Sequence, residues 1–531
     1  MNQETREKGL ETPHPFFMTS RTNQSRLLKT CLFATGLSGI VAEFTLSTLA
    51  SYILGNTTLQ WTLIMSLMLF TMGLGSRLSR YTTDNLLDVF ITIEFVLSTL
   101  CATCAVAAYF GTAWLGESTV VIYSYAGAIG LLIGMEIPIV ARMNDAYEGL
   151  RTNIASVMEK DYYGALVGGL LFAFFALPKL GLTYTPIALG AINYVVASAL
   201  YWRYRDLAAY KTRLHIAFWS AGAGILALSI FAKPILLFGE QSQYKDRIVF
   251  TAQTPYQKLV ITEWQDDHWL FINGSIQFST YDEERYHEPL VHPAMGVAGD
   301  ISRILILGGG DGLALREVLK YGSVSNVTLV DLDPKMTRLG SENPILVAAN
   351  DEAFLDERVS VIHQDAGTYV REAGQIFNVI IIDLPDPKGP DLARLYARDF
   401  YRDCKRALAR EGVLVTQASS PLHAPKAFQC ILKTVASAGL SAVPYHTTIP
   451  TMGTWGWVIA QKADLVGSTE LKGRLSRLQF EIVETDFINN EAIVGMLQFW
   501  KGAFDGMGTL AINTMMDPVV DKYYRESEWG F

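Results

Sequence analysis

The chain has 531 residues, of which 50% are hydrophobic and 18% are charged, and its formal net charge is −9 at neutral pH. At about 150 residues per domain, this length suggests three or four domains. The charge is uneven: residues 1–239 contain 16 basic and 14 acidic residues, and the remainder contains 27 and 38. The acidic C-terminal part argues against a nucleic-acid partner, which needs a basic surface, and is compatible with a cationic substrate.

Seven apolar runs follow a polar N-terminal tail, which we place at residues 1–26. Each run is close to the roughly 20 residues that a helix needs to span a bilayer. The runs lie at about residues 30–53, 58–76, 86–110, 118–141, 163–179, 184–202 and 215–238. A soluble core does not explain seven such runs joined by short polar connectors. We therefore predict a transmembrane domain of about seven helices at residues 27–239.

Lysine and arginine residues in the short loops set the predicted orientation. Fourteen of them flank the runs on the side of the N-terminal tail, and one, Lys179, lies on the other side. This asymmetry predicts a multi-pass protein of the cell (inner) membrane with a cytoplasmic N-terminus. Seven helices would carry residues 240–531 to the opposite face, and a helix count different by one would return them to the cytoplasm.

Three acids, Glu43, Glu94 and Glu136, lie inside the apolar runs. Ionisable groups at membrane depth are costly, which makes these residues candidates for function or for pairing inside the bundle. The alternative is a position near the membrane interface, or a protonated carboxyl group that is hydrogen-bonded.

From Ile248 the pattern changes to short alternating strands with a hairpin signal at Asn273-Gly274, so we assign a small β-strand domain to residues 240–298. Strand-like and helix-like runs then alternate, which predicts a parallel sheet covered by helices on both faces. We assign this Rossmann-like α/β domain, of the S-adenosylmethionine-methyltransferase type, to residues 299–462. Residues 463–531 form a C-terminal extension that packs either as a lid over the site or on the membrane domain.

A glycine loop and three strand-end acids indicate a ligand site. The loop reads GGGDG at residues 308–312, and the next three strands end in Asp331 or Asp333, Asp365 and Asp383. In open α/β sheets, ligands bind outside the carboxyl ends of the strands. Glycines at 308 and 310 let the backbone approach a ligand closely, and an acid at the second strand end accepts hydrogen bonds from a ribose diol.

Asp311 indicates which nucleoside ligand this loop binds. A dinucleotide site would need a third glycine at position 313, which is leucine. A carboxylate in the loop also repels pyrophosphate. It suits a cationic, phosphate-free adenosine derivative, namely an S-adenosyl sulfonium that carries a protonated amine.

The stretch from Tyr244 to Gln461 resembles spermidine synthase, a polyamine aminopropyltransferase. The motifs, in order, are TPYQKLVI, INGSIQFSTYDEERYHEPLVH, ILILGGGDGLALREVL, DLDP, HQDA, DLPDPKGP, LYARDFY and TIPTMGTWGW. The helical N-terminal part is similar to the membrane-fused branch of that family. The resemblance implies transfer of an aminopropyl group from decarboxylated S-adenosylmethionine to a small-molecule amine such as putrescine, without a metal. It also implies 5′-methylthioadenosine and a spermidine-like polyamine as products, and a homodimer.

The resemblance also implies roles for individual residues. On the donor side, Gln257 would contact the methylthioadenosine part, Asp331 the ribose and Asp311 the amine of the transferred chain. Around the adenine the implied residues are Asp365 and Ala366, with Pro390 closing over the base, and Gly308 and Gly310 belong to the same donor half. On the acceptor side, Tyr286, His287 and Asp386 would line the path of the amine, and Asp383 would be the catalytic acid residue.

The sequence departs from the family pattern at several of these places. Asp331 stands where the family has glutamate, and Asp365-Ala366 replaces an Asp-Gly pair. Leu384 and Pro385 replace small polar residues. Met452 replaces a tyrosine that helps to hold the acceptor amine, which weakens the implication of putrescine as the acceptor.

Two alternatives stay open. The same site could serve another S-adenosylmethionine-dependent reaction, such as aminocarboxypropyl or methyl transfer. The membrane domain could instead be a polyamine or nucleoside carrier whose C-terminal part senses the ligand, with Glu43, Glu94 and Glu136 as its candidate residues.

Overall fold

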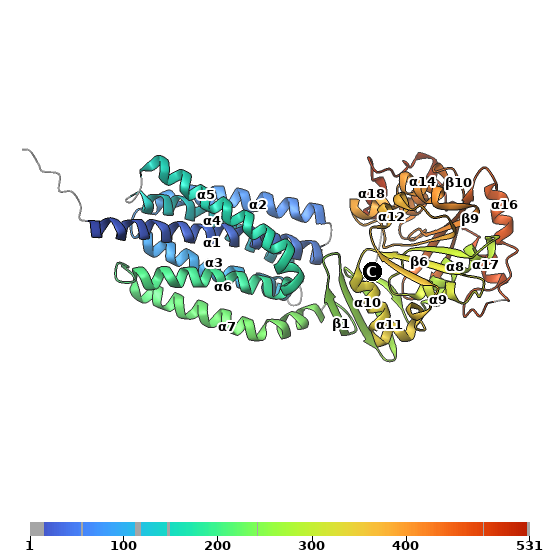
Figure 1. Ribbon diagram of the computed structural model, residues 1–531, viewed down its shortest axis with the longest axis horizontal. Coiled ribbons are helices and arrows are strands. Elements are labelled where there is room, and N and C mark those ends of the chain that lie inside the picture. Colours follow the sequence, from blue (N-terminus) through green and yellow to red (C-terminus); the bar gives the residue numbers. More distant parts are fainter. Residues whose placement is uncertain are drawn as a thin grey trace, which may run out of the picture. The chain divides into compact units, whose positions relative to one another are not determined.

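The computed structural model describes residues 15–54, 57–111, 118–145, 149–241, 243–481 and 483–527. The chain divides into two compact units, Met1–Lys245 and Asp246–Phe531. Figure 1 shows that the first unit is a bundle of long helices and that the second combines sheets and helices. The break follows Lys245, a few residues beyond the boundary that we predicted at residue 240.

The first unit contains seven long helices in its described residues. They are α1 (Pro15–Leu54), α2 (Thr57–Leu78), α3 (Leu86–Phe110), α4 (Ser118–Asn144), α5 (Leu150–Leu171), α6 (Gly181–Tyr204) and α7 (Lys211–Gln241). Short turns of other helix types, η1 (Ser79–Tyr81) and η3 (Phe172–Leu180), extend α2 and α5. Helix α1 begins inside the predicted polar tail, so that tail is helical from Pro15 onward; residues 1–14 lie outside the described residues.

Six helical stretches of the described chain are long and apolar enough to cross a membrane, judged by length and composition. One of them, Arg151–Tyr204, has 54 residues. A straight helix of that length measures roughly 80 Å, whereas the hydrocarbon layer is about 30 Å thick. At Gly181, whose φ is 65°, the chain reverses direction between η3 and α6 (Figure 1). The N-terminal end of α1 and the C-terminal end of α7 therefore lie at opposite ends of the bundle (Figure 1).

Glycines allow pairs of these helices to pack closely. A Cβ atom on Gly75 of α2 would lie 1.9 Å from the carbonyl oxygen of Leu131 in α4. A Cβ atom on Gly164 of α5 would lie 2.0 Å from the carbonyl oxygen of Phe33 in α1. Close backbone approach at small residues is typical of helix packing in membranes, where apolar burial supplies no driving force between helices.

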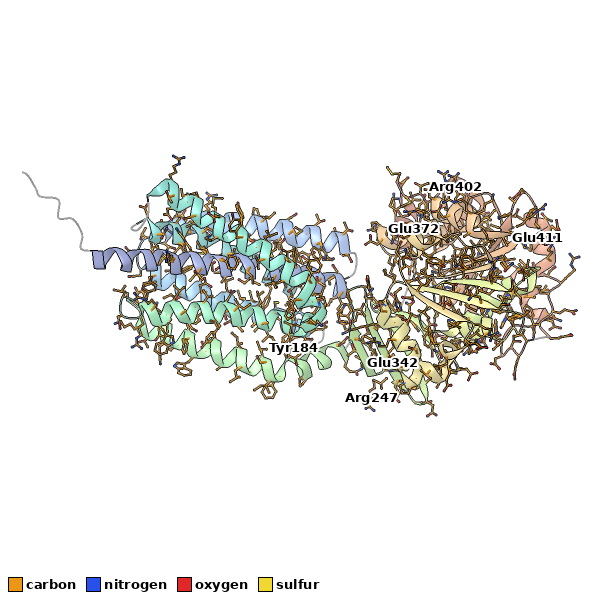
Figure 2. The ribbon with its side chains drawn as sticks, in the orientation of Figure 1. Tyr184, Arg247, Glu342, Glu372, Arg402 and Glu411 are labelled. Atoms are coloured by element: carbon orange, nitrogen blue, oxygen red, sulfur yellow. The ribbon has the colours of Figure 1, made fainter. Side chains whose placement is uncertain are left out.

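The bundle exposes apolar side chains and buries acids. Leu69 and Phe174 are 65% and 79% exposed, whereas Glu94 and Glu136 are fully buried. Thr35 of α1 donates a hydrogen bond of 3.1 Å to Glu94 of α3. Glu43 is also buried, so all three acids of the apolar runs face the interior of the bundle. In the second unit, by contrast, charged side chains such as Glu372 and Arg402 lie at the surface (Figure 2).

The second unit begins with a four-stranded antiparallel sheet in the order β1-β2-β3-β4. Its strands are β1 (Arg247–Gln253), β2 (Lys258–Trp264), β3 (Asp267–Ile272) and β4 (Ser275–Ser279). Asn273 and Gly274, with φ of 50° and 77°, form the two-residue turn between β3 and β4. This is the hairpin that the Asn-Gly pair predicts.

The larger sheet has seven strands in the order β10-β11-β9-β8-β5-β6-β7. They are β5 (Arg303–Gly308), β6 (Asn326–Asp331), β7 (Val359–His363), β8 (Phe377–Asp383), β9 (Leu408–Gln417), β10 (Leu440–Ile449) and β11 (Gly453–Lys462). Strands β5 to β9 are parallel, but β11 runs antiparallel to β9, and β10 antiparallel to β11. The prediction of a parallel sheet is therefore confirmed for β5 to β9 and was wrong at this edge. Strand β10 escaped prediction because Pro444 interrupts its pattern, which only an edge strand tolerates.

Helices cover this sheet between its strands. They are α9 (Leu313–Leu319), α10 (Pro334–Glu342), α11 (Pro344–Ala349), α12 (Ala366–Glu372), α13 (Pro390–Ala393), α14 (Arg398–Ala407) and α15 (Pro425–Ser437), with the short turns η4 (Ala353–Leu355) and η5 (Arg394–Tyr396). One further helix, α8 (Glu284–Val297), falls inside the segment that we predicted as a β-strand domain. Its residues Leu290 and Val291 are buried in the core of the large sheet, so α8 belongs to the Rossmann-like part.

The C-terminal extension packs on the second unit. It contains α16 (Ser468–Leu475), α17 (Asn490–Met496), η6 (Met507–Thr509) and α18 (Val519–Arg525). Glu288 of α8 accepts hydrogen bonds from three successive backbone N–H groups of residues 486–488. Val520 and Tyr524 of α18 join the hydrophobic cluster beside β8 and β9.

Candidate functional site

The glycine loop after β5 lies between two carboxylates. A Cβ atom on Gly309 would lie 3.3 Å from Asp383 Oδ2 at the end of β8, and one on Gly310 would lie 2.6 Å from Asp331 Oδ2 at the end of β6. Gly308 has a φ of 86°, and its Cβ atom would lie 2.0 Å from the carbonyl oxygen of Asp383. Because other side chains would collide at these positions, glycine is needed for the loop to approach both acids.

Hydrogen bonds hold both the side chain and the backbone carbonyl group of Asp311 in place. Its Oδ1 accepts a hydrogen bond of 2.9 Å from the N–H of Leu313, at the start of α9. Asn350 Nδ2 donates to the carbonyl oxygens of Asp311 and Gly340, at 2.7 and 2.8 Å. No sequence motif marks Asn350, which lies at the end of α11, 39 positions along the chain from Asp311.

Asp331, rather than Asp333, is the acid available to a ligand. Asp333 is buried and caps α10 by accepting from the N–H of Lys335, and its other oxygen accepts from Gln257 Nε2 at 3.0 Å. Asp331 is the last residue of β6, and its pKa is raised to about 6 by burial and by the neighbouring Asp333 and Asp311. Gln257 is therefore connected to this part of the site by its hydrogen bond to Asp333.

Asp365 is already engaged by an arginine that the sequence did not predict. It caps α12 by accepting from the N–H of Thr368 at 2.9 Å, and both its oxygens accept from Arg394 of η5. Burial raises the pKa of Asp365, but these partners outweigh burial and lower it. Ala366 is buried directly after it, and Pro390 begins α13 in the loop that follows β8.

Tyr286, His287, Asp311 and Asp383 come together at the centre of the site. Tyr286 donates a hydrogen bond of 2.8 Å to Asp383, and ligand atoms of His287, Asp311 and Asp383 lie within 4.8 Å of one another. Burial and the neighbouring Asp311 raise the pKa of Asp383 to about 6, against the opposing effects of His287 and Tyr286. Asp383 is therefore ionised at neutral pH and binds a proton readily.

His287 carries a positive charge at neutral pH. Burial lowers its pKa, but the carboxylate of Glu283, which lies 2.8 Å from Nδ1, outweighs burial and raises it to about 9. His287, Asp311 and Asp383 are also close enough together to hold a metal ion. The two carboxylates equally suit an organic cation, which is the ligand that the sequence predicts.

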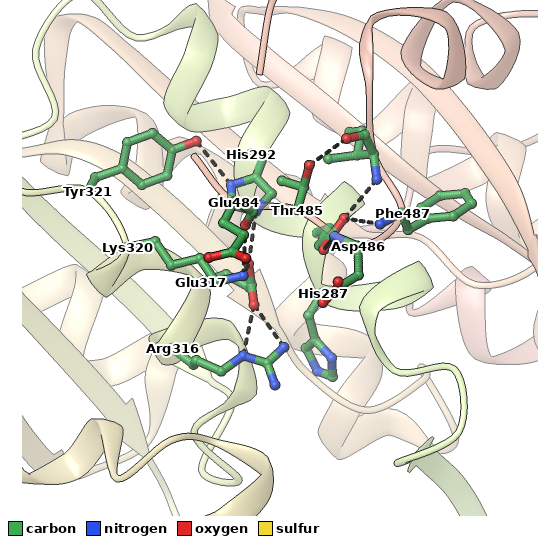
Figure 3. Close-up of polar contacts among 12 residues, drawn as sticks. His287, His292, Arg316, Glu317, Lys320, Tyr321, Glu484, Thr485, Asp486 and Phe487 are labelled. Atoms are coloured by element: carbon green, nitrogen blue, oxygen red, sulfur yellow. Dashed lines mark hydrogen bonds and ion pairs between the residues drawn. The ribbon is translucent and has the colours of Figure 1, made fainter. Parts of the chain in front are cut away.

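A buried ionic network centred on Glu317 (Figure 3) is connected to His287 through Glu283. Arg316 pairs with Glu283 at 2.7 Å and with Glu317 at 2.7 Å. Glu317 is fully buried and also contacts His292 and Lys320, both at 2.8 Å. Glu283 and Glu317 thus lie among three basic groups, His287, Arg316 and Lys320, whereas Asp311 and Asp383 bring two carboxylates to the other side of His287. This network was not predicted, because several of its contacts join residues that are far apart in the sequence.

Asp386 lies in the loop after β8 and is contacted by the C-terminal extension. Tyr524 of α18 donates a hydrogen bond of 2.7 Å to its Oδ2. Its Oδ1 is buried and accepts no hydrogen bond of ordinary geometry from the described residues, although Gln417 and Ser419 lie beside it. Burial raises the pKa of Asp386, while Tyr524 and Lys388 oppose that effect.

Met452 forms part of an apolar wall near Tyr286. It is buried in the same cluster as Tyr286, Trp455 and Trp457, and the rings of Tyr286 and Trp457 are 5.6 Å apart. The turn that carries Met452 is fixed by Thr451, whose N–H and hydroxyl groups both donate hydrogen bonds to Asp282. The position is therefore structured, but it offers no hydroxyl group to a substrate.

Together these residues form a site that suits a cationic nucleoside and an amine. Asp331 ends the strand next to β5, as a ribose-binding acid does, and Asp311 and Asp383 provide negative charge on the other side of the glycine loop. Asp383, with its raised pKa, can accept a proton. Asp386 offers a second carboxylate three residues further along the same loop.

Comparison with known proteins agrees with this geometry. Residues 283–470 match the family model of the spermine/spermidine synthase domain. The chain is 40% identical to polyamine aminopropyltransferase 2 of Aquifex aeolicus (strain VF5) over 506 residues, which cover 94% of this chain and 98% of that protein. It is 35% identical to the polyamine aminopropyltransferase of Oceanobacillus iheyensis, over 95% of this chain and 98% of that one. These alignments include the helical N-terminal unit.

Among solved structures, the spermidine synthase of Thermotoga maritima aligns with 50% of this chain and 88% of its own, at 26% identity and a TM-score of 0.44. A spermidine synthase in complex with the transition-state analogue AdoDATO aligns over 50% and 89%, with a TM-score of 0.45. The family itself is established by the full-length relatives. The chain is an enzyme and belongs to the spermine/spermidine synthase family of polyamine aminopropyltransferases.

Proposed function

We propose that this enzyme is embedded in the membrane and transfers the aminopropyl group of decarboxylated S-adenosylmethionine to a diamine of the putrescine class. The products would be 5′-methylthioadenosine and a spermidine-like polyamine. The observation that carries this proposal is the close approach of Asp311 and Asp383 across the glycine loop, with the pKa of Asp383 raised to about 6.

The paired carboxylates of Asp311 and Asp383 favour the decarboxylated donor. Decarboxylated S-adenosylmethionine ends in a protonated amine, which Asp311 can bind, and its sulfonium adds a second positive charge. Intact S-adenosylmethionine would bring a carboxylate towards Asp311 and Asp383. The nearby cation, His287, is already balanced by Glu283, so it would offset this repulsion only weakly.

In the proposed reaction, the amine nitrogen attacks the carbon bonded to the sulfonium. A new C–N bond forms, the C–S bond breaks, and its electron pair returns to sulfur, which leaves as a neutral thioether. A protonated amine has no lone pair for this attack, so it must first lose a proton. Asp383 accepts that proton directly or through a water molecule, while Tyr286 orients its carboxylate through the 2.8 Å hydrogen bond. Positioning of the two substrates supplies much of the remaining acceleration.

The apolar outer surface of the first unit supports insertion in the cell (inner) membrane with seven crossings. The loop charges favour a cytoplasmic N-terminus, and seven crossings would place the second unit on the other face. We further propose a homodimer, as the family resemblance implies, and no nucleic-acid partner. The carrier hypothesis remains a prediction that rests on the buried Glu94 and Glu136.

The test is a comparison of donors and acceptors with the purified full-length protein. Each donor, decarboxylated or intact S-adenosylmethionine, is incubated with putrescine, other diamines and monoamines, and methylthioadenosine is measured. We expect product from the decarboxylated donor with a short diamine. Methylthioadenosine formed equally from intact S-adenosylmethionine would indicate aminocarboxypropyl transfer, and S-adenosylhomocysteine would indicate methyl transfer. No product from either donor would refute the proposal.

A further inference from the structure

We propose that Tyr524 of the C-terminal helix α18 positions Asp386 and closes the far end of the acceptor site, so that the enzyme accepts a short diamine and rejects longer polyamines. This inference rests on the proposed function. It assigns a role in acceptor binding to helix α18 of the C-terminal extension, which lies beyond the matched family domain at residues 283–470.

Helix α18 is tied to the loop that carries Asp386. The Tyr524 hydroxyl group donates to Asp386 Oδ2 at 2.7 Å, and Tyr524 is only 6% exposed. One turn earlier, Asp521 accepts a hydrogen bond of 2.9 Å from the N–H of Gly389 in the same loop. The N–H of Val520 donates to Asn513 Oδ1. The helix therefore contacts the loop at two points and is itself anchored to the preceding chain.

The other side of the loop is held by the small sheet. Lys388 Nζ donates a hydrogen bond of 2.6 Å to the hydroxyl group of Ser275, at the start of β4. The same ammonium group lies 5.6 Å from the centre of the Tyr524 ring. Lys388 thus links the hairpin β3–β4, the loop after β8 and helix α18, and it brings a positive charge to the end of the site that Tyr524 closes.

Two buried polar atoms lie beside each other in this part of the site, Asp386 Oδ1 and the hydroxyl oxygen of Ser419. Neither has a hydrogen bond of ordinary geometry among the described residues, although the side chains of Ser419 and Gln417 are close enough to lower the pKa of Asp386. Ser419 adopts a φ of 65° at the end of β9, a strained conformation for a residue other than glycine. An ammonium group has three N–H donors and could satisfy both atoms. Tyr524 donates its hydrogen bond to the other oxygen of Asp386, Oδ2. This leaves Oδ1 as the acceptor for the ammonium group.

The order of charged groups along the site explains why the enzyme would accept a diamine and reject a longer polyamine. Asp383, beside Asp311, receives the attacking nitrogen, and Asp386 receives the second ammonium of a diamine. Beyond Asp386 the substrate would meet the ring of Tyr524 and the ammonium of Lys388. A third ammonium, as in a triamine, would be repelled by Lys388 and excluded by the ring.

The acceptor half has an apolar wall at Met452, which is buried in the same cluster as Tyr286. Tyr524 supplies a phenol group to the acceptor half from a different segment of the chain. A short hydrogen bond to a carboxylate is the strong, charge-assisted kind, and it keeps Asp386 oriented.

The test compares Tyr524→Phe with Tyr523→Phe in the full-length protein. Tyr523 is the neighbouring tyrosine of α18, and its hydroxyl group accepts from the backbone of Ala511 away from Asp386. We expect Tyr524→Phe to raise the KM for putrescine about tenfold or more. The kcat, the KM for the decarboxylated donor and the kcat/KM for the monoamine butylamine should change less than about threefold. Tyr523→Phe should leave all four values unchanged.

An unchanged KM for putrescine in Tyr524→Phe would overturn the inference. Equal losses with putrescine and butylamine would also overturn it, because they would indicate a general structural role. If the unaltered enzyme makes no methylthioadenosine with any amine, the proposed function fails instead, so the two failures are distinguishable. As a second variant, the double substitution Tyr524→Ala and Lys388→Ala, which removes both the ring and the ammonium group, should permit turnover of spermidine as an acceptor. Continued rejection of spermidine by this variant would contradict the proposed closure of the site.

Discussion

Replacing Asp383 by asparagine should abolish most activity and at the same time stabilise the protein. The substitution keeps the shape of the side chain and an oxygen that accepts from Tyr286, but it removes the proton acceptor. Loss of a general base typically costs about 10²- to 10⁴-fold in rate. We expect kcat with the decarboxylated donor and putrescine to fall within that range, with little change in the KM for the donor.

The expected gain in stability follows from the pKa of Asp383, which rises from 3.8 to about 6 on folding. An acid with a raised pKa is destabilising when ionised, and this cost develops as the pH rises from 3.8 through 6. A shift of about two units corresponds to at most about 3 kcal/mol at neutral pH. Asparagine carries no charge, so Asp383→Asn should raise the thermal midpoint of the purified protein by several degrees at pH 7, at about 2–4 °C per kcal/mol.

The matched control is Asp464→Asn, which alters an exposed carboxylate of the same unit. It should change neither turnover nor the midpoint. Activity of Asp383→Asn within about threefold of the unaltered enzyme would refute the role of Asp383 as base. A lower midpoint accompanying the loss of activity would show that the carboxylate stabilises the fold, contrary to the reasoning from its pKa.

Three further predictions concern the donor loop, the ionic network and the topology. Gly310→Ala should displace the Asp331 carboxylate, because the new Cβ atom would lie 2.6 Å from Oδ2. The KM for the donor should therefore rise at least tenfold. The control is Gly322→Ala, which has open space around the new Cβ atom and should leave that KM unchanged. The pKa of His287 is raised from 6.5 to about 9, since Glu283 outweighs burial, so its stabilising contribution is full below pH 6.5 and is lost as the pH rises through 9. Thermal midpoints of the unaltered protein should fall across that window, and Glu283→Gln should flatten the fall; parallel curves would exclude this source of pH dependence. Reporter fusions at the two termini should report opposite faces of the membrane, and the same face for both would contradict seven crossings.

The grouping of acids around the glycine loop was largely predictable from sequence because its signals are local. Glycines at 308 and 310, followed by acids at successive strand ends, are enough to indicate a nucleoside site at the carboxyl edge of a sheet. The structure brings Asp311, Asp331 and Asp383 around that loop. The hairpin at Asn273-Gly274 was predictable for the same reason, since the two residues themselves determine the turn.

The supporting contacts of the site could not be predicted, because they join segments that are distant in the sequence. Asn350 supports Asp311, Arg394 engages Asp365, and Tyr524 reaches Asp386 across 138 positions of the chain. No local pattern marks any of these partners. Strand β10 was missed for a different reason, because proline in its middle is acceptable only once the strand is known to lie at an edge.

The most direct test of the proposed function is the identity and stoichiometry of the products. Purified enzyme is supplied with decarboxylated S-adenosylmethionine and putrescine, and both products are quantified by mass spectrometry over time. Aminopropyl transfer predicts spermidine and methylthioadenosine in a 1:1 ratio, with formation of both reduced together in Asp383→Asn. Methylthioadenosine without a matching polyamine, or a polyamine yield that is insensitive to Asp383→Asn, would contradict it.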